Sequence, residues 1–590
     1  MPGGEPDIVE AVRGYALANA VRHGGKAELK PVLAKLLAED PALRDRVKDL
    51  IRIVEGVIEE VNAKPLGEQE RELKARYPHL LGAGEPETRG REREGERMLP
   101  PLPNAYSYGR VTTRFSPNPD CVLHLGSLRA IILSHEYARM YDGRFILRFE
   151  DTDPRLKKAS LEFYQAIRED LEWLSCRWDE EYIQSDRIPI YYEYAARLLA
   201  LGGGYVCTCD GEYFKSRVSR GLPCPCRDLP RSVQEERWHL MLNGEFGEGE
   251  AVLRVKTDLN HPNPAVRDWP ALRIIDPERH PHPRVGGRYR VWPLYNFACG
   301  VDDHLLSVTH IIRGKEHLTN TVRQRYLYHH FGWRYPETMH YGRLRMLDAD
   351  LSKSTILRKV ESGEVSGFDD PRLATLKALR RRGISPQALR QLIMEIGPRP
   401  VDATISWENI YAYNRRILEP SSKRYLYVED PIHLVVEGAP GGLEAKIPYH
   451  PSHPEMGSRT IHVKPGADGS IRLLIAGSDL SLIEDSEHFR LMGLLNARHT
   501  EIGPGEAYAS YEGRGHEEAR ERGIPIIQWV NPEECVDTAV TMPSAHTSKG
   551  KGERALLEAR VDETVQLVRF GFARVDRIDG ESIHLYYAHK

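Results

Sequence analysis

Residues 106–153 run from strand to helix to strand with short turns between them, and this order restricts the fold more than any other feature of the chain. The strand-like run YGRVTTRFSP precedes a Pro/Asn/Asp turn. The helical pattern LHLGSLRAIILSHEYARMY follows, and then a second strand, FILRFEDTDP. This succession is the βαβ unit of an open parallel sheet. Because ligands bind beyond the carboxyl ends of parallel strands, the turn before His124 and the acidic group that begins at Glu150 are expected at one edge.

The pattern changes several times along the 590 residues, for which about four domains are expected. We predict a multidomain fold with an α/β Rossmann-type catalytic core, an inserted domain, an N-terminal helical bundle, a helical stem and C-terminal all-β barrels. The predicted bounds are 1–81 for the helical bundle, 82–105 for a charged linker, 106–204 for the first half of the core, 205–290 for the insertion, 291–368 for the second half, 369–422 for the stem and 423–590 for the β region.

Charge and hydropathy exclude several classes of protein. Lysine and arginine number 82 against 86 acidic residues, so binding of nucleic acid through net charge alone is excluded, whereas a local basic patch is not. The chain has no run of about 18 apolar residues and does not start with a cationic segment followed by an apolar core. We therefore expect a cytoplasmic protein with no membrane partner.

Two short elements are candidates for binding a polyphosphate. His124, Gly126 and Ser127 lie where a turn meets a helix, and a helix N-terminus offers free N–H groups to an anion while a glycine lets it approach the backbone. Ser352-Lys353-Ser354 places a cation between two hydroxyls. Taken alone, the first is more often an ordinary helix start, and the second is more often an exposed loop.

Together with their surroundings, these elements resemble a known family. RFSPNPDCVLHLGSLRA, LRFEDTDP and DADLSKS follow one another as in the class I aminoacyl-tRNA synthetases for glutamate and glutamine, with HLGS and LSKS at the HIGH and KMSKS motifs. FDDPRLATLKALRRRGI and HPSHPEMGSR are also similar to this subgroup. The helical N-terminus and β-type C-terminus resemble the archaeal and eukaryotic glutamyl enzymes. Nearly the whole chain is covered by the resemblance.

The resemblance implies roles for individual residues. The activity would be ATP-dependent formation of glutamyl-adenylate, with Mg²⁺, and transfer of the glutamyl group to the 3′-terminal ribose of glutamate tRNA; charging of glutamine tRNA stays open. The insertion would bind the acceptor stem, and the basic stem helices and β barrels would follow the RNA. DNA is not an expected partner. Catalysis is assigned to His124 and Lys353, ATP binding to His124, Gly126, Ser127, Ser352 and Lys353, and glutamate binding to Arg114, Glu150, Tyr295, Cys299 and Arg313.

Arg313 carries the predicted choice of amino acid. Glutamyl enzymes tend to have an arginine at this position and glutaminyl enzymes a cysteine. Glutamate has one carboxylate more than glutamine, and two guanidiniums, Arg114 and Arg313, match two carboxylates. Bound glutamine would leave one of them partly unpaired in a desolvated site, which costs a few kcal/mol. Which arginine meets which carboxylate is left open.

The motifs depart from the family pattern at three positions. Ser127 stands where the first motif usually ends in histidine, and Cys121 stands where glycine is common. Asp350 replaces the first lysine of the second motif, which makes Lys353 the main expected polyphosphate contact.

Four of the eight cysteines form two close pairs inside the predicted insertion. Cys207 and Cys209 are separated by one residue, as are Cys224 and Cys226. Four thiolates at this spacing suit tetrahedral Zn²⁺ in a structural role, and a catalytic zinc would need an open position that four cysteines do not leave. Free or redox-active cysteines are the alternative.

Three rival functions are weighed against the glutamyl enzyme. Arg313 disfavours a glutaminyl-tRNA synthetase. The presence of His124, Lys353, Glu150 and Arg114 disfavours a non-catalytic tRNA-binding scaffold. A small-molecule adenylyltransferase would leave the long β region and basic stem without a role.

Overall fold

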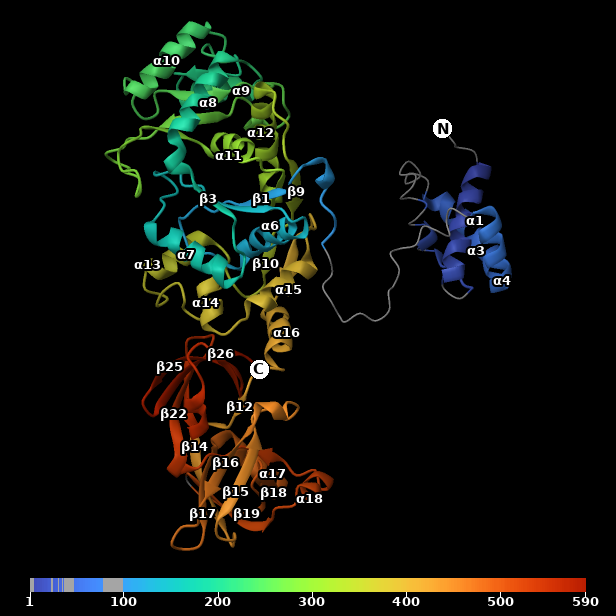
Figure 1. Ribbon diagram of the computed structural model, residues 1–590, viewed down its shortest axis with the longest axis vertical. Coiled ribbons are helices and arrows are strands. Elements are labelled where there is room, and N and C mark those ends of the chain that lie inside the picture. Colours follow the sequence, from blue (N-terminus) through green and yellow to red (C-terminus); the bar gives the residue numbers. More distant parts are fainter. Residues whose placement is uncertain are drawn as a thin grey trace. The chain divides into compact units, whose positions relative to one another are not determined.

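The computed structural model describes residues 5–22, 25–29, 31–33, 36, 47–77, 99–503 and 505–590. The chain divides into two compact units, Met1–Gly95 and Glu96–Lys590 (Figure 1), each of which is described by itself. Most of the predicted linker, residues 82–98, lies outside the described residues.

The first unit is helical. Helices α1 (Glu5–Arg22), α3 (Val47–Asn62) and α4 (Leu66–Arg76) enclose an apolar core. Val12 and Ala16 on α1 are fully buried, as are Val54 and Val61 on α3. These residues follow the helical spacing seen in the sequence, because side chains three, four or seven positions apart share one face.

A parallel sheet forms the centre of the second unit. Strands β1 (Thr112–Phe115), β2 (Arg144–Phe149) and β3 (Glu180–Ile183) pair in this order, with α6 (Leu128–Met140) and α7 (Leu161–Trp173) as crossovers. Strands β8 (His310–Gly314) and β9 (Glu337–Tyr341) form a second parallel pair, joined by α12 (Leu318–Phe331). Thr309 N donates to the Thr112 carbonyl at 3.0 Å, so β8 begins beside β1.

An antiparallel sheet is inserted in the sequence between β3 and β8. Its strands are β4 (Gly204–Cys207), β5 (Val252–Val255), β6 (Pro270–Ile274) and β7 (Val291–Pro293), paired in sequence order. The surrounding helices are α8 (Ile188–Ala200), α9 (Gly211–Ser219), α10 (Arg231–Asn243) and α11 (Tyr295–Leu305). In Figure 1 this group lies at the end of the second unit opposite the C-terminal strands.

The segment after the parallel sheet bonds back to α6. It contains β10 (Leu344–Met346), α13 (Lys353–Glu361), α14 (Leu376–Arg381), α15 (Pro386–Ile396), β11 (Ala403–Ile405) and α16 (Trp407–Leu418). The fully buried Arg129 on α6 donates to the carbonyls of Gly342, Gly397 and Arg399. Leu125 N donates to the Ala374 carbonyl at 3.0 Å. The start of α6 is therefore fixed by residues far along the chain.

The C-terminal region is mainly strands. A seven-stranded sheet has the order β12-β24-β25-β26-β22-β23-β13, and since one residue, Leu426, separates β12 from β13, the sheet closes on itself. A six-stranded sheet has the order β17-β14-β20-β19-β18-β21, and β15 pairs with β16. The bounds are β12 (Arg424–Tyr425), β13 (Tyr427–Glu429), β14 (Pro431–Glu437), β15 (Leu443–Pro448), β16 (Ser458–Val463), β17 (Ile471–Ala476), α17 (Leu480–Ser486), β18 (His488–Leu491), β19 (Leu495–Gly503), β20 (Glu506–Gly513), α18 (His516–Glu521), β21 (Ile526–Ile527), β22 (Cys535–Thr541), β23 (Thr547–Glu553), β24 (Thr564–Leu567), β25 (Gly571–Asp579) and β26 (Ser582–His589).

The end of the predicted linker differs from expectation. Leu99, Leu102 and Ala105 are buried in the core around the parallel sheet, and the Leu102 amide donates to the Tyr141 hydroxyl. Their isolated positions between prolines and polar residues show no periodicity, so no local pattern predicts that this stretch packs.

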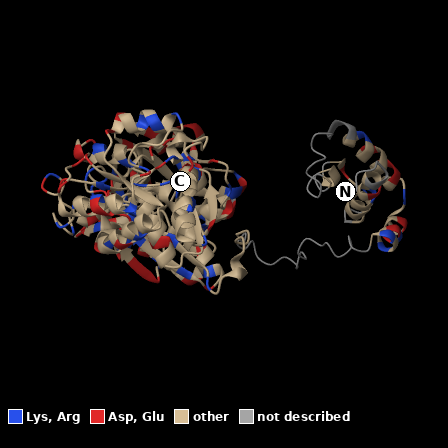
Figure 2. Ribbon diagram, turned by 90° about the horizontal axis from the view of Figure 1, so that it is seen from above, with Lys and Arg blue, Asp and Glu red and all other residues tan. Residues whose placement is uncertain are grey.

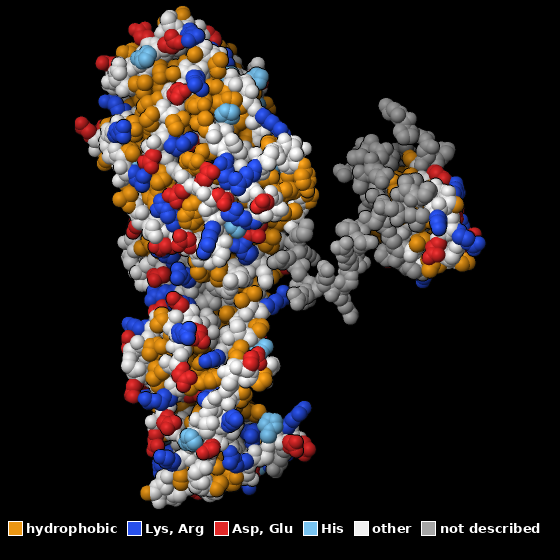
Figure 3. Space-filling model, viewed as in Figure 1, with side chains coloured by type: hydrophobic (Ala, Val, Ile, Leu, Met, Phe, Trp, Pro, Cys, Tyr) orange, Lys and Arg blue, Asp and Glu red, His pale blue; other side chains and the backbone are white. Residues whose placement is uncertain are grey.

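Positively and negatively charged residues are mixed along the ribbon in Figure 2, and their side chains are mixed over the face shown in Figure 3. This mixing agrees with the formal charge of −4. Among the described residues, no helix has both the length and the apolar character needed to cross a membrane.

Replacing Gly342 by alanine is expected to lower the free energy of unfolding of the second unit by about 1–3 kcal/mol. A Cβ here would lie 2.1 Å from the carbonyl oxygen of Val401, so the backbone leading into β10 and β11 has to separate. Thermal melting of the full chain checks this. Gly109→Ala is the control, because nothing lies within 4 Å of its Cβ position; equal melting temperatures for the two variants would contradict the prediction.

Candidate active site

His124 starts the turn that leads into α6. Its backbone is extended, and its Nδ1 accepts a hydrogen bond from the Gly126 amide at 3.1 Å across the 3-10 turn Leu125–Ser127. A Cβ on Gly126 would lie 2.7 Å from the imidazole, so the ring needs glycine here. Burial and then the charge of Lys353 lower the pKa of His124 to about 4. The imidazole is therefore neutral at neutral pH and can hydrogen-bond a phosphate without adding charge.

Lys353 lies beside this turn. It is the first residue of α13, and its Nζ pairs with Asp120 Oδ1 at 2.8 Å, in the turn before His124. The Cβ of Leu351 lies 3.8 Å from the Cβ position of Gly126, which brings the two candidate phosphate elements together. The Ser352 amide donates to Asp350 Oδ1 at 2.7 Å, so the aspartate that replaces the usual lysine shapes this loop.

The Ser127 and Ser352 side chains lie at these elements without capping a helix. Ser127 directly precedes α6 and makes no side-chain cap bond to it. Ser352 precedes α13, and its hydroxyl bonds that of Ser354 at 2.9 Å. Both hydroxyls are partly exposed next to His124 and Lys353.

Two arginines on neighbouring strands share one buried carboxylate. Arg114 Nε on β1 lies 3.0 Å from Asp303 Oδ1, and Arg148 Nη1 on β2 lies 2.8 Å from the same oxygen. Burial raises the pKa of Asp303, but the two guanidiniums outweigh burial and hold it below its ordinary value. Arg148 also pairs with Glu150 at 3.0 Å. Arg114, expected to meet a substrate carboxylate, is thus already partly neutralised by the protein.

The remaining predicted pocket residues lie around this pair. Cys299 Sγ lies 2.9 Å from Glu150 Oε1, and burial raises the pKa of the Cys299 thiol well above its usual value. The Tyr295 hydroxyl lies 3.4 Å from His317 Nδ1. Arg313 is 5% exposed and donates through Nη2, while its Nε and Nη1 are buried and find no hydrogen-bond partner in the described part of the chain.

The four clustered cysteines converge in the insertion. Cys207 and Cys224 sulfurs lie 3.8 Å apart, those of Cys209 and Cys226 lie 3.7 Å apart, and all four lie within 4.8 Å of one another. Disulfide sulfurs would be about 2.05 Å apart. Four ligands at the zinc–sulfur distance of about 2.3 Å in a tetrahedron put sulfurs about 3.8 Å apart. The cluster therefore has the dimensions of a tetrathiolate zinc site.

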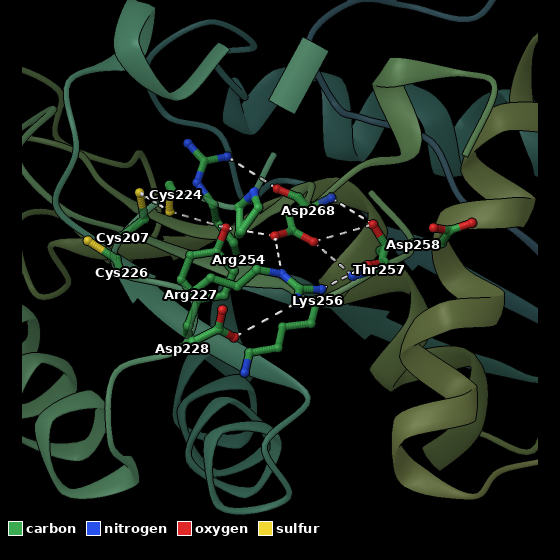
Figure 4. Close-up of polar contacts among 12 residues, drawn as sticks. Cys207, Cys224, Cys226, Arg227, Asp228, Arg254, Lys256, Thr257, Asp258 and Asp268 are labelled. Carbon is green, nitrogen blue, oxygen red and sulfur yellow. Dashed lines mark hydrogen bonds and ion pairs between the residues drawn. The ribbon is translucent and has the colours of Figure 1, made fainter. Parts of the chain in front are cut away.

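The surroundings of the cluster also fit a metal centre. Figure 4 shows Arg254 and Asp268 next to three of the cysteines. The Tyr205 hydroxyl and Arg227 both bond Asp268 Oδ2, at 2.8 and 2.9 Å, and so fix the backbone around the cysteine pairs. The Arg254 guanidinium lies 3.4 Å over the Phe214 ring beside the cluster. Its positive charge would partly offset the net negative charge of four thiolates around one Zn²⁺.

Comparison with known proteins identifies the family. Residues 110–420 match the model of the class I (E and Q) tRNA synthetase catalytic domain, and residues 422–512 match that of the anticodon-binding domain. The chain is 48% identical to the glutamate–tRNA ligase of Thermococcus kodakarensis, over 99% of this chain and 100% of that one. It is 49% identical to the same enzyme of Pyrococcus furiosus, over 98% of both chains. The chain belongs to the class I tRNA synthetases for glutamate and glutamine.

The family resemblance did not supply every residue in this synthetase pocket. Asp303 was not predicted, although Tyr295, Cys299 and Asp303 recur every four residues on α11 and so share one face. Arg148, inside the quoted LRFEDTDP, was also missed. Asp120, which pairs with Lys353, gave no recognisable signal because the pair joins residues 233 positions apart.

The basic stem of this synthetase is less available to RNA than its sequence suggested. Arg372 pairs with Asp370, Arg381 with Asp369 and Asp576, and Arg390 with Glu136. Arg382 is 1% exposed and lies over the Trp407 ring. The sequence shows the cations but not the acidic and aromatic partners that fold onto them.

Proposed function

We propose that the protein activates L-glutamate with ATP and transfers it to the 3′-terminal ribose of glutamate tRNA. The family supplies the reaction, and the relatives in Thermococcus and Pyrococcus are glutamate–tRNA ligases. The observation that carries the choice of glutamate is Arg313, a buried guanidinium with two nitrogens that have no partner among the described residues. Arg313 and Glu150 both interact electrostatically with Tyr295.

The first step joins glutamate to the α-phosphate. An α-carboxylate oxygen attacks the α-phosphorus, the bond from that phosphorus to the β-phosphate oxygen breaks, and pyrophosphate leaves. Such chemistry depends on positioning and on neutralising charge. We assign ATP binding to His124, Gly126, Ser127, Ser352 and Lys353, with Lys353 as the cation for the phosphates. Mg²⁺ bound with the ATP would neutralise further phosphate charge.

The second step transfers the glutamyl group. A ribose hydroxyl at the end of the tRNA attacks the acyl carbon, and AMP leaves. We assign the acceptor end of the tRNA to the β4–β7 insertion and the anticodon to the C-terminal strands, where residues 422–512 match an anticodon-binding domain.

The amino-acid pocket contains one cation in excess. We assign the ammonium group of glutamate to Glu150 and its carboxylates to Arg313 and Arg114, with Tyr295 and Cys299 lining the pocket. Asp303 already neutralises part of the charge of Arg114 and Arg148, whereas among the described residues no carboxylate pairs with Arg313. Bound glutamine would leave Arg313 less well paired, which disfavours it.

Aminoacylation with separately labelled glutamate and glutamine, on purified glutamate tRNA and glutamine tRNA, tests this function. Glutamate on the first tRNA is the expected product. Glutamate on both tRNAs would add a second RNA substrate. Charging with glutamine would overturn the assignment to Arg313, and no charging at all would favour a non-catalytic tRNA-binding protein.

We infer that Cys207, Cys209, Cys224 and Cys226 hold a structural Zn²⁺. The sulfur spacing, the nearby Arg254 and the four protein ligands, which would fill a tetrahedron, support this role. A bound zinc would link β4 to the segment after α9 and so stabilise the insertion.

Purified protein is expected to contain about one zinc per chain, and Cys209→Ser is expected to lose most of it because three cysteines hold zinc less tightly than four. Elemental analysis and limited proteolysis of the insertion check this. Cys535→Ser is the control, since Cys535 lies in β22 and bonds only a backbone carbonyl. Unchanged metal content in Cys209→Ser, or a Cys207–Cys224 disulfide under reducing conditions, would contradict the assignment.

A further inference from the structure

Arg313 is held by one nitrogen in a cradle of three neutral side chains, Thr321, Gln324 and Tyr335. Its Nη2 lies 2.6 Å from Thr321 Oγ1, 3.0 Å from Gln324 Oε1 and 3.1 Å from the Tyr335 hydroxyl. Thr321 and Gln324 share a face of α12 because they are three residues apart. Tyr335 also donates to Gln324 Oε1 at 2.9 Å, so the cradle residues fix one another.

The cradle leaves the charge of Arg313 uncompensated. Within the part of the chain that the structure describes, Arg313 forms no ion pair, whereas Arg114 and Arg148 share Asp303. Gln324 is completely buried and Thr321 is 6% exposed, so bulk solvent does not screen the charge of Arg313 on that side. The free Nε and Nη1 keep three N–H groups for another acceptor.

Neighbouring histidines do not change this charge. Burial, followed by the positive charge of Arg313, lowers the pKa of both His317 and His340 to about 4. His340 is therefore neutral at neutral pH, and its Nε2, 2.9 Å from Thr321 Oγ1, can accept the threonine proton. The threonine oxygen then keeps a lone pair for Arg313.

We propose that Thr321, Gln324 and Tyr335 are positioning residues for amino-acid selection: they orient Arg313 through Nη2 and, by being uncharged, reserve its Nε and Nη1 for a carboxylate of glutamate. This inference rests on the proposed function. The neutrality of the cradle matters as much as its hydrogen bonds. If residue 324 carried a carboxylate, that carboxylate would pair with Arg313, and Arg313 would no longer be free to pair with a carboxylate of glutamate.

Gln324→Glu tests the charge directly, with Gln324→Met as the matched control of similar length. The assay is glutamate-dependent ATP–pyrophosphate exchange in the presence of tRNA. We expect Gln324→Glu to raise KM for glutamate by about 10- to 100-fold, in the range of a lost charge-assisted hydrogen bond, with KM for ATP unchanged. Gln324→Met keeps the free charge of Arg313 and is expected to raise KM for glutamate by less than about tenfold.

A second variant keeps the test open if the buried Gln324 variants fold poorly. Tyr335→Phe removes one acceptor and is expected to raise KM for glutamate by about three- to tenfold with little change in kcat. Tyr192→Phe is its control, since the Tyr192 hydroxyl donates to the Val291 carbonyl and not to Arg313.

The outcomes separate this inference from the proposed function. Unchanged KM for glutamate in Gln324→Glu and Tyr335→Phe, or equal increases in Gln324→Glu and Gln324→Met, would overturn the neutral cradle while wild-type protein still charges tRNA with glutamate. If wild-type protein does not use glutamate at all, the proposed function itself fails.

Discussion

Replacing Lys353 by methionine is expected to lower the rate of glutamate-dependent ATP–pyrophosphate exchange by about 10²- to 10³-fold, the range for losing one preorganised group that stabilises transition-state charge. The Lys353 ammonium lies beside the His124 turn, where Asp120 pairs with it at 2.8 Å. The neutral imidazole of His124 adds no charge there, so few other groups can replace this cation.

Lys359→Met provides the matched control for Lys353→Met. Lys359 is on the same helix, has similar exposure and pairs with Glu364 at 3.0 Å, away from the His124 turn. The Lys359→Met substitution is expected to change the exchange rate by less than about twofold, because a surface ion pair contributes little. An equal loss in both variants would show that α13 tolerates neither change, and a small loss in Lys353→Met would remove Lys353 from the mechanism.

Replacing Asp303 by asparagine is expected to lower the free energy of unfolding of the second unit by about 3–5 kcal/mol, because two buried guanidiniums lose their shared carboxylate. Arg114 is 5% exposed, and Arg148 is completely buried. Denaturant or thermal unfolding of the full chain measures the loss. Asp579→Asn is the control, since Asp579 pairs with Arg577 in an exposed position and is expected to cost less than about 1 kcal/mol.

The loss of stability caused by Asp303→Asn is expected to become smaller as the pH falls. The two arginines hold the pKa of Asp303 below its ordinary value of 3.8, despite burial. A carboxylate with a lowered pKa stabilises the folded state above its unfolded pKa, and this stability is lost as the pH falls through the folded pKa. The difference in melting temperature between wild type and variant is therefore expected to be constant above about pH 5 and to narrow below about pH 4. A difference that grows in acid would contradict the ion-pair explanation.

The sequence predicted the elements whose periodicity is local. The strand, helix and strand around His124, the alternating C-terminal runs and the helices of the first unit all appear in the structure. Leu99 and Leu102 were assigned to a linker because burial of isolated apolar residues between prolines depends on a distant surface.

Prediction of the site was also limited by contacts between residues that are distant in the sequence. The family motifs named Arg313, but its cradle comes from α12 and Tyr335 and follows no motif. The composition of residues 369–397 suggested a cationic surface, whereas Arg381 is neutralised by Asp576, 195 residues later. Ion pairs between distant residues cannot be read from the local spacing of charges.

The hydrogen bonds of Arg129 set an order in which the chain can complete the candidate nucleotide site during synthesis. Arg129 follows the His124 turn directly, but its carbonyl partners extend to Arg399, 270 residues later. At ordinary translation rates, the ribosome needs roughly 14 to 54 s to add that length. Until this interval ends, the His124 turn has been synthesised but the last carbonyl that binds Arg129 has not. Nascent chains stopped before Arg399 therefore carry the His124 turn, a candidate phosphate element, without the complete set of carbonyls that holds α6.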